Sequence, residues 1–461
     1  MGVGVSGWQL ARAVSKLGQL GVVSGTGLSV VLARRLGCGD PGGHMRRALR
    51  HFPVPDISNR VLATYYIAGG KNPGEPHRVI PMPTLDSPTS FIELTVVANF
   101  VEVWLAKESH RGVVGINYLE KLQIPTLPSL LGAMLAGVDY VLMGAGIPRS
   151  IPRVLDDFAA GLPSQLRVDV DGALPTDDFS CRLDPTAFLG FTPTLRRPKF
   201  LAIISSVVLA MTLARKSDGH VDGFVIEGAT AGGHNAPPRG TLSLTAGGEP
   251  VYGQRDAVDL AKIRELGLPF WLAGGFGQPG RLRDALAAGA EGIQVGTAFA
   301  FCEESSVTAP LKRQAIGLSR AGRAEVFADP KASPTGFPFK VVRLCGTLSD
   351  AGAYEQRERI CDIGHLRKPY RRADGSVGYR CPAEPVDNYV AKGGPTEETD
   401  GRVCLCNALF ATIGLEQSLP DGSPELPVVT AGNDVATVSS WTKEDHGTYE
   451  AKDVVEALLP V

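Results

Sequence analysis

Three glycine-rich segments, each directly after a short apolar run, hold the residues best suited to bind an anion. They are residues 227–234, 274–277 and 296–299. Backbone N–H groups of glycine can approach an anion without an intervening Cβ, and a helix starting near Gly280 adds a favourable dipole. One Gly-Gly pair alone is typical of a tight turn, but three such segments after successive runs favour a phosphate site.

His234 is the candidate reactive side chain, because it follows Gly232 and Gly233 and imidazole titrates near neutral pH. The alternative is a loop histidine with a purely structural role. The sequence contains neither G-x-x-x-x-G-K-[ST] nor a strand followed by G-x-G-x-x-G with an acidic partner. A mononucleotide therefore suits the glycine segments better than a dinucleotide.

Short apolar runs that alternate with amphipathic helical patterns indicate the elements that position these residues. Such alternation predicts a parallel sheet, either open and doubly wound or closed into a barrel. We predict an α/β fold, a TIM-type (β/α)8 barrel with loop insertions and a C-terminal appendage. The predicted strands are residues 21–24, 113–117, 139–143, 201–205, 223–226, 270–273 and 292–295.

An eighth strand should precede the first helix, for which Ser6 is the predicted N-cap and Gly18 the end. Only residues 1–5 are available for it. A barrel lacking one strand would expose two edges. We therefore expect either that the native start lies upstream of Met1 or that residues 1–5 form a stunted strand.

The chain divides into a predicted barrel at residues 1–325 and an appendage at residues 326–461. Two stretches interrupt the alternation within the barrel. Residues 38–90 are rich in proline, and residues 165–198 are typical of a polar β-hairpin. Both are expected to be insertions in barrel loops.

Composition limits the classes of partner and the location. The 461 residues carry 46 Lys and Arg against 48 Asp and Glu, so no charge excess favours nucleic acid or an anionic membrane. The longest apolar stretch, residues 200–214, is shorter than the about 18 to 20 residues that span a bilayer. Eight cysteines are too few for a disulfide scaffold, and no signal peptide is evident. We predict a cytoplasmic protein without a transmembrane segment.

Over roughly residues 1–302 the sequence resembles the nitronate monooxygenases, FMN-dependent β/α barrels related to flavin-containing enoyl reductases. The family's Met-containing loop and first helix are matched by residues 1–14, and its Gly-x-Asn by residues 115–117. Its Ala-Gly-Gly-His motif is matched by residues 231–234, its Gly-Gly phosphate loop by residues 274–275, and its Gly-Thr turn by residues 296–297. The chain departs from the family at Thr230, usually Glu, and at residues 235–239.

The resemblance implies an FMN site and assigns His234 to the substrate side as the catalytic residue. Asn117 would hydrogen-bond the flavin. The full set of residues expected to bind the cofactor is Gly2, Asn117, Ser205, Gly232, Gly233, Gly274, Gly275, Gly296 and Thr297.

The implied reaction is oxidation of an alkyl nitronate with O2 to a carbonyl compound and nitrite. One alternative is an enoyl thioester reductase that takes electrons from NAD(P)H and in which His234 donates a proton, with an acyl carrier protein as possible partner. Another is a flavin-binding scaffold without catalysis whose C-terminal region contacts a partner. The physiological substrate and the oligomeric state are not readable from the sequence.

The appendage contains Cys361, Cys381, Cys404 and Cys406 together with His365. Zinc sites usually show paired C-x2-4-C spacings, whereas here the one pair has the uncommon C-x-C gap. Reduced, partly buried thiols and no metal site are therefore expected. The basic run at residues 357–372 is expected to be a solvated face, with contact to an acidic carrier protein or a neighbouring subunit as the alternative.

Overall fold

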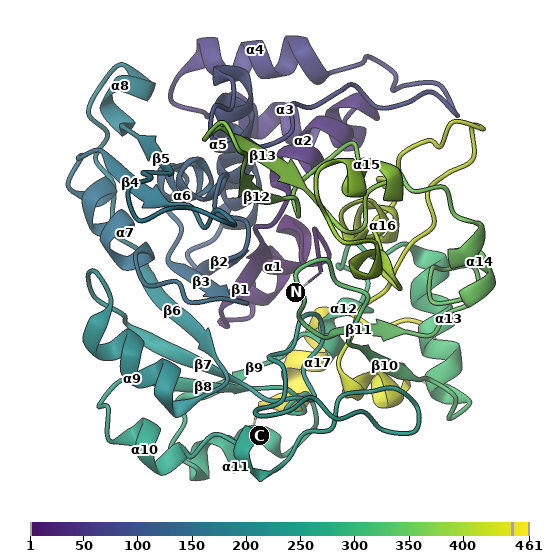
Figure 1. Ribbon diagram of the computed structural model, residues 1–461. Coiled ribbons are helices and arrows are strands. Elements are labelled where there is room, and N and C mark those ends of the chain that lie inside the picture. The colour runs from purple at the N-terminus through teal and green to yellow at the C-terminus, as the bar shows by residue number, and fades with distance from the viewer. Residues whose placement is uncertain (1, 444–446, 460–461) are drawn as a thin grey trace.

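The computed structural model describes residues 2–443 and 447–459, and a seven-stranded parallel sheet organises its first 300 residues (Figure 1). The strand order, β1-β2-β3-β6-β7-β8-β9, follows the chain, so each strand pairs with the next strand of this sheet in the sequence. The strands are β1 (Gly21–Ser24), β2 (Val114–Leu119), β3 (Tyr140–Gly144), β6 (Lys199–Ile204), β7 (Gly223–Glu227), β8 (Phe270–Ala273) and β9 (Gly292–Gln294).

All seven predicted strands are confirmed, two of them, β1 and β8, with the predicted bounds. Most of their residues are buried, as expected when helices cover a parallel sheet. The α/β class is therefore established.

The closed eight-stranded barrel is not confirmed. Within residues 2–443 and 447–459, β1 pairs with β2 and β9 with β8, and these two end strands do not pair with each other. Residues 2–5 form a turn, so the stunted strand is not present there, and Met1 lies outside the described residues. The sheet is a curled, open wall (Figure 1).

The chain before the first helix lies along β1 without forming a strand. The amide of Ser24 donates to the carbonyl oxygen of Ser6 over 2.8 Å, and the Ser6 hydroxyl donates to the carbonyl oxygen of Val22 over 2.6 Å. Because its hydroxyl is used there, the predicted N-cap is wrong by one residue and Gly7 takes that position. Gly18 follows the helix with a left-handed backbone, as predicted.

Helices connect successive strands and cover the sheet. They are α1 (Trp8–Lys16), α2 (Leu28–Gly37), α5 (Thr89–Lys107), α6 (Thr126–Leu135), α7 (Ile151–Ala159), α9 (Val207–Lys216), α10 (Leu260–Arg264), α11 (Arg281–Ala287), α12 (Thr297–Ala300) and α13 (Ala309–Arg320). The short 3-10 helix η2 (Gln254–Asp256) lies between β7 and α10.

Helix α5 is long and apolar enough, by length and composition alone, to cross a membrane, and the sequence analysis did not single it out. It packs against α1, α2 and α6, and 78% of its most apolar window is buried. Its buried carboxylates are paired, Glu93 with Arg60 and Glu102 with Arg35. We interpret α5 as a core helix of the fold.

The two stretches predicted to be insertions hold short elements of their own. Residues 38–90 hold η1 (Pro41–Gly43), α3 (His44–Leu49) and α4 (Pro55–Tyr65). The predicted hairpin is an antiparallel pair, β4 (Ser164–Arg167) with β5 (Ser180–Leu183), followed by α8 (Pro185–Leu189).

The region after α13 lies beside the open wall, green to yellow in Figure 1. Side chains of this region belong to the same hydrophobic core as those of the sheet, since Leu405 and Phe410 pack in one cluster with Val23 and Ile116. Its elements are β10 (Val326–Asp329), β11 (Phe339–Val342), α14 (Ala351–Gln356), β12 (Lys368–Arg371), β13 (Val377–Arg380), α15 (Val386–Ala391), η3 (Thr396–Thr399), α16 (Leu405–Thr412), η4 (Asn433–Trp441) and α17 (Ala451–Leu458).

Candidate functional site

A cavity of about 990 Å³ opens at the carboxyl ends of the parallel strands. Five of the residues that line it are at or near the last position of a strand, and they come from β1, β2, β3, β7 and β9. These residues are Ser24, Asn117, Gly144, Glu227 and Gln294. This is the edge at which parallel α/β folds place their ligands.

The region after residue 325 supplies the opposite wall of the cavity. That wall is mostly apolar and consists of Phe339, His365, Leu366, Leu405, Cys406, Leu409 and Phe410. The predicted appendage is therefore part of the candidate site, and the boundary at residue 325 stays a prediction.

The residues predicted to bind the cofactor fall into two groups. Gly2, Asn117, Gly232, Gly233 and His234 line the cavity. The others are not among the residues described as lining it, namely Ser205, Gly274, Gly275, Gly296 and Thr297.

Ser205 belongs to a smaller neighbouring pocket of about 360 Å³ that shares Glu227 with the main cavity. In this pocket the Arg239 guanidinium donates to the Ser205 carbonyl oxygen over 2.7 Å. The two pockets therefore adjoin at Glu227.

His234 is held between β7 and the start of β11. The amide of Lys340 donates to the carbonyl oxygen of Gly233 over 3.0 Å, and the amide of Asn235 donates to that of Pro338 over 2.9 Å. The imidazole Nε2 lies 2.7 Å from the Ser333 hydroxyl. Burial lowers the pKa of His234 to about 4, so the ring is neutral at physiological pH.

Glu227 is a functional candidate to which the sequence analysis assigned no role. It ends β7, lines the cavity, and burial raises the pKa of its carboxyl to about 7. A carboxyl group that is half protonated at neutral pH can act as either an acid or a base. The sequence did offer a signal for this role, because Glu227 is the one acidic residue at the end of a predicted strand.

The predicted phosphate turns lie next to residues 430–434 of the C-terminal region. The amide of Gly432 donates to the Thr297 hydroxyl over 2.8 Å, and that of Gly277 donates to the Asp434 carboxylate over 3.3 Å. The ammonium group of Lys340 contacts Asn433, so one buried cation adjoins these turns.

The residues present fit FMN in two parts. A Cβ placed on Gly296 would meet no atom within 4 Å, which leaves open space at this turn for a phosphate. The cavity extends to Gln294, two residues before this turn, so a flavin whose phosphate lies at the turn would direct its ring toward the cavity. Backbone amides and one lysine form a suitable donor set for a phosphate monoester.

Comparison with known proteins gives a family match and two partial relatives. Residues 198–328 match the nitronate monooxygenase family model. The chain is 39% identical over 106 residues to the nitronate monooxygenase of Pseudomonas aeruginosa, which covers 22% of this chain and 27% of that protein.

The second relative is the (3aS,4S,5R,7aS)-5-hydroxy-7a-methyl-1-oxo-octahydro-1H-indene-4-carboxyl-CoA dehydrogenase of Mycobacterium tuberculosis. The identity is 24% over 229 residues, which covers 46% of this chain and 60% of that protein. The match to each of these two proteins therefore spans less than two thirds of its length.

Among solved structures, the chain is similar to FabK from Thermotoga maritima, with 13% identity and a TM-score of 0.46 over 98% of this chain and 88% of that one. The family match is the informative result, because it runs from β6 to β10 and includes Glu227, His234 and the predicted phosphate turns. Over residues 198–328 the chain is therefore similar to the nitronate monooxygenase family.

Proposed function

We propose that this chain is an FMN-dependent oxidoreductase whose reaction takes place in the cavity at the carboxyl ends of β1, β2, β3, β7 and β9. The observation that supports this most directly is the coincidence of two results. The segment that matches the family model supplies Glu227, Gly232, Gly233 and His234 to that cavity. FMN, when bound, would supply the electron transfer.

The chain's own residues would hold the cofactor and the substrate. Backbone amides at Gly274, Gly275, Gly296 and Thr297 would bind the phosphate, and Asn117, at the end of β2, would meet the ring system. Ser333 orients the His234 imidazole through its contact with Nε2. The neutral ring then acts as a hydrogen-bond partner and not as a cation.

For the substrate we propose an alkyl nitronate, oxidised with O2 to a carbonyl compound and nitrite. The support is the family model and the Pseudomonas aeruginosa relative. In this reaction His234 would donate a hydrogen bond to a nitronate oxygen. Glu227 would take the α-proton when the substrate arrives as the neutral nitroalkane.

A second candidate function, enoyl thioester reduction with NAD(P)H as electron donor, is favoured by two observations. The C-terminal wall offers Leu366, Leu405, Leu409 and Phe410 to an acyl chain. The Mycobacterium tuberculosis relative is named for a CoA ester. Glu227 is then a better proton donor to the α-carbon than His234, because a ring with a pKa of about 4 has already lost its acidic imidazolium proton near neutral pH.

The acyl carrier protein belongs to this second function as a proposed partner. The basic run does not form the expected solvated face. Arg357 is 5% exposed and pairs with Glu425 over 2.6 Å, and Arg371 pairs with Asp177. Contact with a carrier would therefore depend on the exposed Lys368 and Arg372. We also propose a cytoplasmic location, supported by the burial of α5 inside the fold.

Paired assays on the purified protein test these proposals. The protein is expected to bind FMN and to take up O2 with a small alkyl nitronate. In parallel, NAD(P)H oxidation with an enoyl thioester tests the second function. A protein that binds FMN but turns over in neither assay supports the scaffold without catalysis, and a protein that does not bind FMN contradicts all three functions.

A further inference from the structure

We propose that Cys361, Cys381, Cys404 and Cys406 bind an iron–sulfur cluster in the C-terminal region. The four side chains line one cavity of about 250 Å³. They come from three separate places: the loop before β12, the position directly after β13, and the start of α16. The fold thus brings together four of the chain's eight cysteines, which local spacing alone did not connect.

The four thiols are free and shielded from solvent. Cys381 and Cys404 are buried, Cys361 and Cys406 are partly buried, and none of the four forms a disulfide. Four free cysteines gathered at one place inside a protein are typical of a metal or iron–sulfur site.

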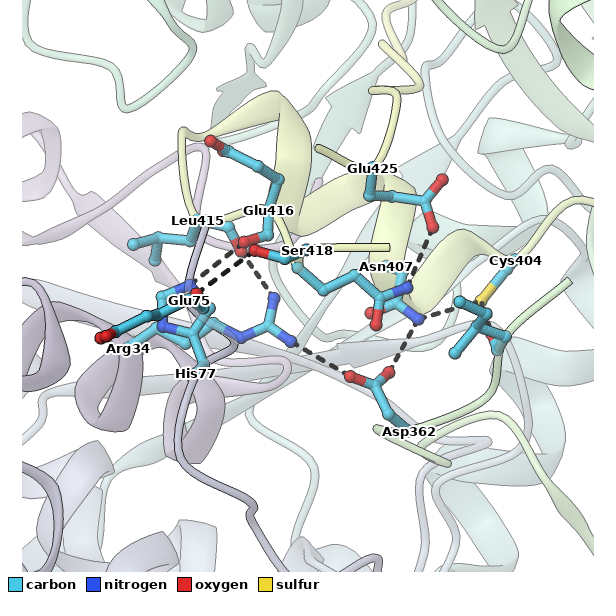
Figure 2. A network of polar contacts seen from close by, with 12 residues as sticks. Arg34, Glu75, His77, Asp362, Cys404, Asn407, Leu415, Glu416, Ser418 and Glu425 are labelled. Carbon is cyan, nitrogen blue, oxygen red and sulfur yellow. Dashed lines mark hydrogen bonds and ion pairs between the residues drawn. The ribbon is translucent and has the colours of Figure 1, made fainter. Parts of the chain in front are cut away.

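Hydrogen-bond donors point at the sulfur atoms, as they do where thiolates bind a metal. The backbone N–H of Ala383 bonds to Cys381, and that of Leu366 bonds to Cys406. The Asn407 amide donates to the Cys404 sulfur over 3.7 Å, as Figure 2 shows. Such bonds stabilise thiolates and tune the reduction potential of iron–sulfur clusters.

Charged side chains of both signs lie close to the thiols, and the carboxylates among them include Asp362 and Glu384. Arg357 interacts with Cys404, and Arg367 lies close enough to Cys361 to favour its thiolate. Arg34, which is 4% exposed, pairs over 3.6 Å with Asp362, the residue after Cys361, as Figure 2 shows.

The arrangement favours a cluster over a single ion. In the part of the chain that the structure describes, no three His, Cys, Asp or Glu side chains are grouped so as to hold one metal ion. In a four-iron cluster each thiolate binds its own iron, so the sulfur atoms surround a volume and do not converge on one point. These four cysteines likewise line one shared pocket, and no three of them converge on one point.

The proposed cluster adjoins the candidate flavin cavity. Leu366, Leu405 and Cys406 line both cavities and form the wall between them. The site itself does not depend on the proposed function, because its evidence lies in the cysteines and their neighbours.

Metal and sulfide analysis of the full-length protein, purified without oxygen, tests this proposal. We expect about four iron and four acid-labile sulfide ions per chain, and an electron paramagnetic resonance signal after reduction with dithionite. If the purified protein lacks iron, reconstitution with ferrous iron and sulfide should restore both. Iron and sulfide below about one per chain after reconstitution would overturn the proposal, as would about one zinc ion in their place.

Two variants separate a cluster from adventitious iron. The double variant C404S/C406S should lose iron and sulfide, whereas C302A, which alters a buried cysteine outside the group, should retain both. Equal iron and sulfide in the two variants would contradict the assignment. If the double variant does not fold, as judged by circular dichroism, the wild-type iron and sulfide content decides the question. Because neither measurement requires FMN or turnover, their failure is distinct from failure of the proposed function.

Discussion

The imidazole Nε2 of His234 lies 2.7 Å from the hydroxyl oxygen of Ser333, a residue 99 positions later in the chain. Ser333 is fully buried and also bonds to the Thr335 hydroxyl over 2.8 Å. The loop that follows β7 is thereby fixed to the segment between β10 and β11. The orientation of the His234 side chain is thus set by the C-terminal region and not by the parallel sheet and its helices alone.

Replacing His234 with alanine should lower kcat/KM by about 100-fold or more while FMN remains bound, because a positioned hydrogen-bond partner is lost. Ser333→Ala should lower it by only about 10-fold, since the ring remains but is no longer oriented. Steady-state kinetics with the better substrate of the paired assays, together with flavin absorbance, measure both effects.

The pH profile provides the control for this prediction. Because the pKa of His234 is lowered to about 4, its ionisation should not appear in kcat/KM between about pH 5 and 8. If the alanine variant turns over as fast as the wild type in every assay, His234 has no catalytic role.

Glu227 should make the stability of the protein depend on pH. Its carboxyl pKa rises from 4.5 in the unfolded chain to about 7 in the fold, so its contribution is fully present below about pH 4.5 and is lost as the pH rises through 7. The size of this contribution is about 3 kcal/mol or less. Urea unfolding across this range should show a smaller loss of stability in Glu227→Gln than in the wild type.

The exposed Glu291→Gln is the matched control for that experiment, because it removes a carboxylate outside the cavity. His234 has the opposite sign, since its lowered pKa costs stability as the pH falls from 6.5 to about 4. Glu227→Gln and Glu291→Gln should therefore each be compared with the wild type at every pH, and not with each other. Parallel curves for Glu227→Gln and wild type would contradict the raised pKa.

The predicted phosphate site can be tested at Gly296 without disturbing the fold. A Cβ there meets no atom within 4 Å, and the residue is not in a left-handed conformation. Gly296→Ala should therefore leave the melting temperature unchanged but weaken FMN binding by about 10-fold, because the methyl group enters the space meant for the phosphate. Fluorescence titration of the apoprotein with FMN measures this.

Gly317→Ala, which also adds a methyl group into open space but in α13, should leave FMN affinity unchanged. Equal affinity of both variants for FMN would show that the phosphate lies elsewhere.

Sequence reasoning predicted the sheet well because its strands are short apolar runs between turn residues. Glycines mark the ends of the apolar runs at β1 and β8, and the predicted bounds of both strands are correct. The cap at Ser6 was wrong because its hydroxyl bonds to the neighbouring β1, a contact that no local pattern reveals.

The site was only partly predictable for the same reason. His234 stands beside two glycines and was found from local sequence. Ser333, by contrast, acts through a contact between distant segments, and the four cysteines become neighbours only when β12, β13 and α16 are packed. Glu227 is next to the motif, but its raised pKa comes from burial, which sequence does not give.

Substitution of Arg34 tests how firmly the C-terminal region is attached to the helices and strands of the first 300 residues. Its guanidinium donates to the carbonyl oxygen of Leu415 over 2.6 Å and pairs with Asp362 over 3.6 Å (Figure 2). Removing one partner of a buried ion pair leaves an uncompensated polar group, which costs about 3 to 5 kcal/mol. Asp362 is more exposed than Arg34, so we expect about 3 kcal/mol for Arg34→Met, with the loss of the carbonyl bond included.

The matched control is Arg153→Met, since Arg153 is largely exposed and pairs with Asp157 within α7. An exposed pair contributes at most about 1 kcal/mol. Urea unfolding should thus rank the two variants clearly, and Arg34→Met should also expose the C-terminal region to proteolysis before the barrel. If both variants unfold at the same urea concentration, the network in Figure 2 does not hold the two regions together, and the cavity wall must be secured by its apolar contacts alone.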